Sequence, residues 1–207
     1  MSDRAIVPAR VLVTLCRQRF SRRLAGRFGW VAAFGVLAVT TAAMLIDKDS
    51  GAVINEGVRW TMWLALGPLV LSMANQPAQR DRDDGIELLA CGRGHSRGEL
   101  AAARWFAATI ELTLRLVPAI APSLILAANT ARPQLLWHAA GLSLFAPLAG
   151  LVLGTLAIVT GYLAARGRFA VVCIVILPAV IGKLVGADGW SIPGSLDALL
   201  VSLTGVL

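Results

Sequence analysis

Charged residues are scarce in this chain. Asp, Glu, Lys and Arg make up 15% of its 207 residues, whereas hydrophobic residues make up 57%, and the mean hydropathy is +0.73. About a quarter of the residues of an average soluble domain are charged, so this composition excludes an ordinary soluble protein. The polar stretches are also too short to form a separate soluble domain. The sequence therefore predicts a single transmembrane domain over residues 1–207.

Cysteine is scarce as well. Cys16, Cys91 and Cys173 form no CxxC pair and lack the spacing of metal ligands, which argues against a disulfide framework and a zinc site. The sequence also lacks an HExxH motif and a pair of intramembrane aspartates, patterns that would indicate an intramembrane enzyme. We therefore predict no catalytic residue, no metal site and no cofactor in this chain.

Long apolar runs are abundant, and a membrane-spanning helix needs about 20 mostly apolar residues. We expect five full spans, at residues 29–46, 60–75, 101–128, 135–165 and 169–185. A sixth run at residues 192–207 is shorter and contains Asp197, so it is either a short sixth span or a re-entrant or interfacial helix. The predicted fold is an all-α, polytopic bundle of transmembrane helices.

Basic residues predict the orientation of these spans, because cytoplasmic loops carry more Lys and Arg than outer loops. Seven arginines precede the first span and five lie between residues 80 and 104, whereas the loops at residues 47–58 and 129–134 carry one basic residue each. We therefore expect a cytoplasmic N-terminus and a location in the inner (cytoplasmic) membrane. These basic flanks account for the net charge of +7, so nucleic acid is not an expected partner.

Residues 4–27 precede the first span and combine an apolar patch at residues 11–16 with flanking arginines. Such a segment is attracted to the anionic inner leaflet of the lipid membrane. We predict an interfacial helix here, and a disordered basic tail is the alternative.

The loop at residues 77–99 is the most informative part of the sequence. A run of mixed charge leads to Gly85 and then to a short apolar segment, which predicts a short helix near residues 84–91. Ser96 and Glu99 have the spacing of a capping box, so we expect the helix of the third span to begin near Ser96. A short helix with exposed leucines is suited to docking into a groove of a partner protein. A solvated connector is the alternative.

This loop resembles the cytoplasmic loop between the second and third spans of type-2 ABC exporter permeases. In that family a charged run is followed by a glycine, a glutamate, a leucine pair and a Pro-Ser-Arg segment. The residues that carry the resemblance are Asp83 or Asp84, Gly85, Glu87, Leu88, Leu89, Ser96 and Arg97, with Arg104 as the basic residue that enters the third span. The glutamate lies one position earlier than in the family, and the proline is absent. Length and layout are also similar to the heme-exporter-B permeases of the same group.

The resemblance implies that residues 77–99 form a coupling loop that docks into an ABC ATPase subunit. That partner would bind ATP and Mg, since this chain has no GxxxxGK[ST] phosphate loop. The implied function is the permease subunit of an ABC transporter, an exporter, which pairs with a second copy or with a sister permease. The alternative function is a non-transporting scaffold or sensor that docks another cytoplasmic partner through the same loop.

Glu111 and Arg115 are four residues apart within the third predicted span, so their side chains share one helix face. Charges at membrane depth cost about 2.5–3.5 kcal/mol each on insertion scales, and they usually face protein or water. The two residues form either a neutralised pair that ties this helix to a neighbour or part of a substrate path.

Two features of the fourth predicted span concern its packing and its outer end. Ala146, Gly150 and Gly154 form a stripe of small residues that predicts close helix packing within the subunit, with packing between subunits as the alternative. His138 lies next to Trp137, and we expect it to be an interfacial polar residue.

Overall fold

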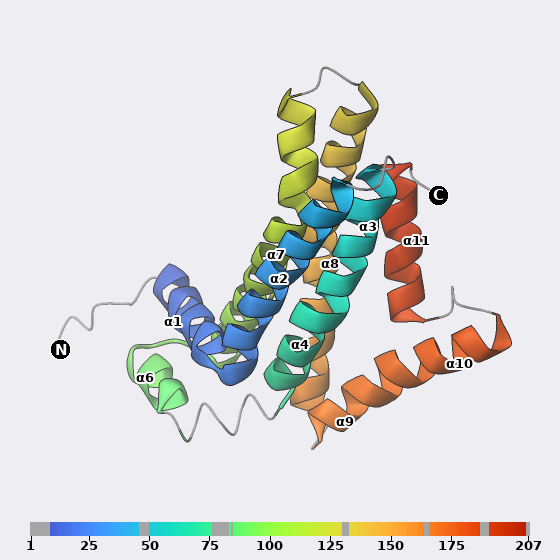
Figure 1. Ribbon diagram of the computed structural model, residues 1–207. Helices are drawn as coiled ribbons and strands as arrows, with labels where there is room; N and C mark the ends of the chain where they lie inside the picture. The colour runs from blue at the N-terminus through green and yellow to red at the C-terminus, as the bar shows by residue number, and fades with distance from the viewer. Residues whose placement is uncertain are drawn as a thin grey trace.

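The computed structural model describes residues 9–45, 50–75, 83, 85–129, 133–163, 166–186 and 191–205. All secondary structure within these residues is helical, and no strand occurs among them. The all-α prediction is therefore confirmed. Figure 1 shows the long helices packed side by side, with α6 (Ile86–Gly92) at one end of the bundle. We call this the α6 end and the opposite end the distal end.

Four helical segments among the described residues are long and apolar enough to cross a membrane. They are α2 (Leu24–Met44), α7 (Arg97–Asn129), α8 within residues 134–163, and the continuous helix at residues 167–185. The last segment consists of α9 (Gly167–Val171), η2 (Val172–Ile176) and α10 (Leu177–Val185). These helices support a multi-pass membrane protein and agree with four of the five predicted spans.

The second predicted span differs from its prediction at its start. The helix does not begin at residue 60 but at Ser50, and it runs through α3 (Ser50–Thr61), η1 (Met62–Leu66) and α4 (Gly67–Met73). Most of the predicted loop at residues 47–58 is therefore helical. These added turns carry polar side chains, which find partners on other helices, as described below. This helix is not among the four described segments that are long and apolar enough to cross a membrane.

The predicted interfacial segment contains α1 (Ala9–Arg22), which ends five residues earlier than the predicted boundary at residue 27. Leu12, Cys16 and Phe20 recur every four residues and are buried against the bundle. Arg23 breaks the helix, and α2 begins directly after it. A β-carbon at Gly26 would lie 2.2 Å from the carbonyl oxygen of Phe20, so this sharp turn requires glycine.

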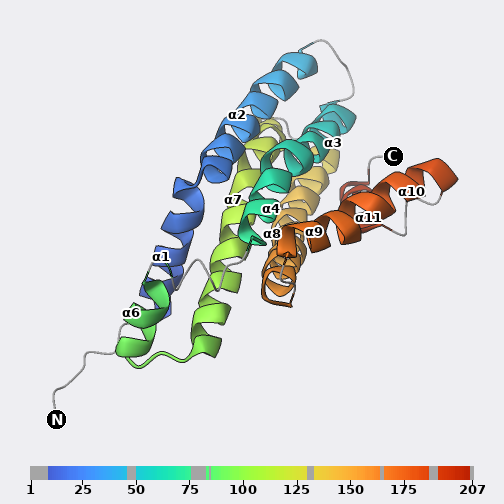
Figure 2. The ribbon, with the colours of Figure 1, turned by 90° about the horizontal axis from the view of Figure 1, so that it is seen from below.

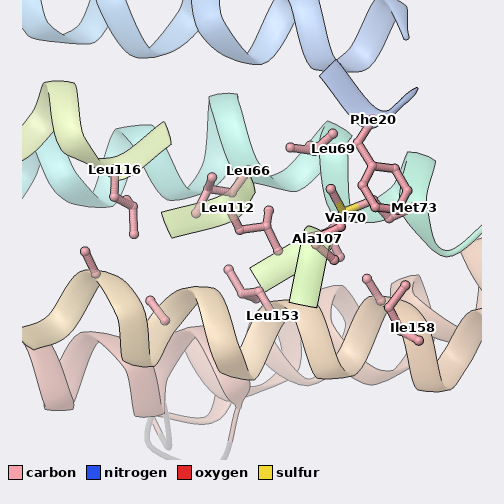
Figure 3. Packing of buried hydrophobic residues seen from close by; sticks show 14 of the residues in the cluster. Phe20, Leu66, Leu69, Val70, Met73, Ala107, Leu112, Leu116, Leu153 and Ile158 are labelled. Carbon is pink, nitrogen blue, oxygen red and sulfur yellow. The ribbon is translucent and has the colours of Figure 1, made fainter. Parts of the chain in front are cut away.

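The core lies where α7 packs against α8 (Pro133–Leu163) and η1, and α4 also packs against α8. Figure 3 shows Leu112 of α7 between Leu66 of η1 and Leu153 of α8. A β-carbon at Gly150 would lie 2.2 Å from Oγ1 of Thr113, and one at Gly154 would lie 2.8 Å from Oγ1 of Thr109. The small residues of α8 therefore let it approach α7 closely, which confirms packing within the subunit.

The C-terminal helix α11 (Ile192–Thr204) has 13 residues and is about 20 Å long, shorter than the hydrocarbon core of about 30 Å. It packs on α8 and ends at the distal end, beside the start of α3. The helix from α9 to α10 leans away from the bundle before α11 returns to it (Figures 1 and 2). The segment is therefore a short apolar helix, as both a short sixth span and a re-entrant or interfacial helix require.

Candidate functional site

The residues of the predicted coupling loop lie on and around α6. Gly85 directly precedes this helix and has a φ of 69°, a left-handed conformation that glycine adopts without strain. Leu88 is 82% exposed and Leu89 is 45% exposed, whereas Ala90 is buried. Asp84 lies outside the described residues. The short helix predicted near residues 84–91 is confirmed, and it presents both leucines away from the bundle.

One ion pair joins α6 to the start of α7, and a second set of polar contacts caps α7. Nε of Arg97 lies 2.7 Å from Oε1 of Glu87 in an ion pair. The backbone N–H of Ser96 donates to Oε2 of Glu99 at 2.9 Å, and the N–H of Glu99 donates to Oγ of Ser96 at 3.1 Å. This reciprocal pair of hydrogen bonds is the predicted capping box, and α7 begins at Arg97, directly after Ser96. Glu87 and Arg97 therefore join α6 to α7, whereas Ser96 caps α7.

Residues 94–98 read Gly-His-Ser-Arg-Gly and match the G-x-S-x-G pattern of hydrolase nucleophiles, which the prediction of no enzyme overlooked. In hydrolases that serine lies on a turn between a strand and a helix. Here Ser96 follows the helix α6, and its hydroxyl caps α7. His95 contacts Oε2 of Glu99 through Nδ1 at 3.2 Å. The local geometry is that of a helix start.

The helix α6 also faces α1 across a hollow of about 690 Å³. Leu89, Ile86 and Gly85 line one side, and Arg19 and Arg22 of α1 line the other. Figures 1 and 2 both place α6 beside α1 at the same end of the bundle. The α6 end therefore combines two exposed leucines with a basic concave surface, a combination that suits a protein partner with an apolar contact and acidic side chains.

The predicted contact between Glu111 and Arg115 is confirmed. Nη1 of Arg115 lies 2.6 Å from Oε2 of Glu111, and the residues are 0% and 4% exposed. Nη2 of Arg115 also donates to the carbonyl oxygen of Gly26 at 3.2 Å. The pair therefore neutralises itself in part and ties α7 to the start of α2, as the first of the two interpretations expects.

A third charge completes this buried site and was missed by the sequence. Arg17 of α1 donates from Nε to Oε1 of Glu111 at 3.1 Å. The two residues are 94 positions apart, so no local spacing could indicate the contact. Glu111 therefore holds two arginines, one from its own helix and one from α1.

The first transmembrane helix fits closely around the Arg115 side chain. The guanidinium carbon of Arg115 lies 5.1 Å from the ring centroid of Trp30, within cation–π range. A β-carbon at Gly29 would lie 3.1 Å from Nε of Arg115 and 3.0 Å from the carbonyl oxygen of Ala65. We call Arg17, Gly29, Trp30, Glu111 and Arg115 the ion-pair cluster. It joins α1, α2 and α7 inside the bundle.

A second polar network lies at the distal end. Oγ of Ser123 lies 2.9 Å from Nδ1 of His138, and Nε2 of His138 lies 3.1 Å from Oδ1 of Asn55. Nδ2 of Asn55 donates to Oγ1 of Thr204 at 2.9 Å, and Thr204 donates to the carbonyl oxygen of Leu200. All four side chains are buried. The expectation that His138 is interfacial is therefore wrong, because its side chain is buried and has polar partners on α7 and α3.

This network joins α3, α7, α8 and α11, and its atoms support one consistent direction of donation. When Ser123 donates its hydroxyl proton to Nδ1 of His138, a neutral His138 carries its own proton on Nε2. That Nε2–H then donates to the carbonyl oxygen of Asn55. Asn55 then donates onward to Thr204. The short C-terminal helix is therefore fastened to the bundle by satisfied hydrogen bonds as well as by apolar packing.

No group of three or more His, Cys, Asp or Glu residues in the described part of the chain is arranged to hold a metal ion. Comparison of the chain with protein-family models, with curated proteins and with solved structures finds no match.

Proposed function

We propose that this chain is the membrane-spanning permease subunit of an ATP-driven exporter in the inner (cytoplasmic) membrane. A separate ATPase subunit would bind at the α6 end and supply ATP hydrolysis. The observation that carries this proposal is α6 itself, a short helix that the Glu87–Arg97 ion pair joins to the start of α7 while Leu88 and Leu89 remain exposed. A rigid helix with an apolar exposed face is what helix-in-groove docking requires.

A route for movement from α6 into the membrane bundle supports the proposal. The Glu87–Arg97 ion pair connects α6 to α7, and α7 packs directly on α1. Both α1 and α7 reach the ion-pair cluster, where Arg17 and Arg115 share Glu111. A partner that pulls or tilts α6 therefore acts on helices that are joined again by charges deeper in the bundle.

The exposed apolar surface fits the predicted second permease copy or sister permease as well as lipid. Only 17% of the residues in the apolar window of α2 are buried, and the same holds for the helix at residues 167–185. Side chains such as Val31, Phe34 and Ile181 are exposed on these helices. A dimer of permeases around a shared path would cover part of this surface.

Co-purification in mild detergent tests the proposed partner. We expect an ATP-hydrolysing protein to co-purify with the wild type and not with a Glu87→Ala, Leu88→Ala double variant. Leu163→Ala is the matched control, since Leu163 is also 82% exposed but lies at the end of α8. Absence of any ATPase with the wild type would contradict the proposal. A partner without ATPase activity that depends on Leu88 would favour a scaffold or sensor.

A further inference from the structure

A cavity of about 660 Å³ lies on the side of the bundle where the helix of α9, η2 and α10 leans away. Its volume falls within the range of about 300–1,000 Å³ that is usual for small-molecule sites. The walls are mostly apolar and come from α4, α8, η2 and α11, with Leu71, Leu153, Val175 and Leu196 among the lining residues. The cavity is separate from α6 and from the ion-pair cluster.

Both π-helical segments of the described chain line this cavity, η1 through Met62 and η2 through Val175 and Ile176. Each segment is followed two residues later by a proline, Pro68 or Pro178. Proline lacks an amide proton and its ring clashes with the carbonyl four residues earlier, so a widened turn relieves the helix.

Proline alone does not account for these widened turns. Pro118 and Pro122 lie inside α7, and Pro147 lies inside α8, yet both helices remain α-helical throughout. Single π turns occur frequently at functional sites. Their position on two facing walls of one cavity therefore points to a site shaped for an occupant.

Charged side chains gather on the polar part of the cavity lining. Arg59 forms ion pairs with Asp197 at 2.5 Å and with Glu56 at 3.1 Å. Lys183 also lines the cavity and forms no ion pair with another described residue. Arg59 and its two partners together carry one net negative charge, and Lys183 carries one positive charge. Among the residues that the structure describes, the cavity lining therefore offers one excess charge of each sign next to an apolar interior.

These charged side chains are partly exposed beside the apolar interior, that of Arg59 by 36% and that of Asp197 by 43%. Arg59 is nine residues after Ser50, which places it about 14 Å along the helix from its distal start. Charged groups next to an apolar interior are costly unless they are paired or hydrated. A ligand head with complementary charges of both signs would satisfy Lys183 and the excess carboxylate together.

We propose that this cavity binds a zwitterionic phospholipid. Its phosphate would lie against Lys183, its ammonium group against the carboxylates of Glu56 and Asp197, and its acyl chains in the apolar part beside η1 and η2. This site does not depend on the proposed ATPase partner, because none of the residues that line it belongs to α6 or α1.

Native mass spectrometry of the purified full chain in detergent tests the site. The probes are phosphatidylethanolamine and phosphatidylglycerol, added separately after delipidation, and the readout is the number of lipids retained per chain. We expect the wild type to retain one phosphatidylethanolamine with an affinity at least about tenfold above that for phosphatidylglycerol. Lys183→Gln should lower that affinity about tenfold.

Matched tryptophan variants test the location. Ala179→Trp fills the cavity from α10 and should abolish retention, whereas Leu184→Trp on the same helix should not, since Leu184 is 81% exposed and does not line the cavity. Leu71→Trp on the opposite wall gives a second test if Ala179→Trp fails to fold, as judged from its thermal unfolding.

Three outcomes would overturn the proposal. One is a wild type that retains no lipid, and another is equal retention by the cavity-filling variants and Leu184→Trp. Stronger binding of phosphatidylglycerol would overturn the zwitterionic assignment. A dimer that dissociates when Ala179 is replaced, with no lipid retained by the wild type, would identify the cavity as a contact between two copies.

Discussion

Arg17 on α1 donates a hydrogen bond to Glu111 in the middle of α7, and Glu111 also holds Arg115 one helical turn further on. The side chain of Arg17 is partly exposed, whereas Arg115 is completely buried. Glu111 therefore connects a solvent-accessible arginine on a peripheral helix to a buried arginine in the bundle. This relation makes α1 part of the bundle rather than a separate surface element.

Removal of one charge from the ion-pair cluster should be more harmful than removal of two. Glu111→Gln leaves the buried Arg115 without its carboxylate, which should cost about 3–5 kcal/mol of stability, whereas a Glu111→Leu, Arg115→Leu double variant removes the buried charge as well. Thermal unfolding of the purified protein in detergent measures the difference. Equal loss in the single and double variants would contradict the pairing.

Arg17→Gln should loosen α1 with a smaller loss of stability. Arg17 is 37% exposed, so screening by solvent reduces the contribution of its ion pair to about 1 kcal/mol. Hydrogen exchange of residues 9–22 measures the loosening, with Arg10→Gln as the control at an exposed position of the same helix. Unchanged exchange in Arg17→Gln would show that apolar packing alone holds α1.

Gly29→Ala should destabilise the contact of α2 with α7. The added β-carbon would lie 3.0 Å from the carbonyl oxygen of Ala65 and 3.1 Å from Nε of Arg115, so the helices must shift, at a cost of about 1–3 kcal/mol. Gly35→Ala is the control on the same helix, because nothing lies within 4 Å of its added β-carbon. Thermal unfolding that ranks Gly35→Ala as the more harmful change would refute this contact.

Breaking the distal polar network should release α11. Thr204→Val removes the acceptor of Asn55 and leaves a buried amide unsatisfied, which should cost about 1–3 kcal/mol. Hydrogen exchange over residues 192–204 should become faster, whereas Ser202→Ala at an exposed position of the same helix should leave it unchanged. The same exchange in both variants would show that the network does not fasten α11.

The sequence predicted polar contacts within single helices and missed the polar contacts between helices. The Glu111–Arg115 pair and the Ser96–Glu99 capping box depend on spacings of four and three residues, and both are formed. Arg17 and His138 could not be placed in the same way, since their partners depend on how distant helices cross. Local spacing fixes which residues share one helix face, but not which helix covers that face.

The second predicted span illustrates the same limit. Asn55 and Arg59 interrupt the apolar pattern, so composition predicts a helix that begins at residue 60. The structure extends it to Ser50, because Asn55 reaches Thr204 and Arg59 reaches Asp197 on α11. Polar residues inside the helical bundle are tolerated where another helix supplies a partner. That partner is encoded about 140 residues later in the chain.

Labelling of native Cys91 tests the predicted orientation. Cys91 lies exposed on α6, whereas Cys16 is buried. A membrane-impermeant maleimide should label Cys91 in inside-out vesicles and not in intact cells. Ser202→Cys in a Cys91→Ala background should show the opposite pattern, since Ser202 lies near the distal end of α11. Labelling of Cys91 in intact cells would place the α6 end outside.

Photo-cross-linking from position 88 in living cells tests the central proposal most directly. A photoreactive amino acid in place of Leu88 should form an adduct with an ATP-hydrolysing protein, identified by mass spectrometry, while the same amino acid at the equally exposed Leu163 should not. An adduct with an ATPase that is specific to position 88 is the result we predict. The same adducts at both positions, or adducts at position 88 that contain no ATPase, would contradict a coupling role for α6.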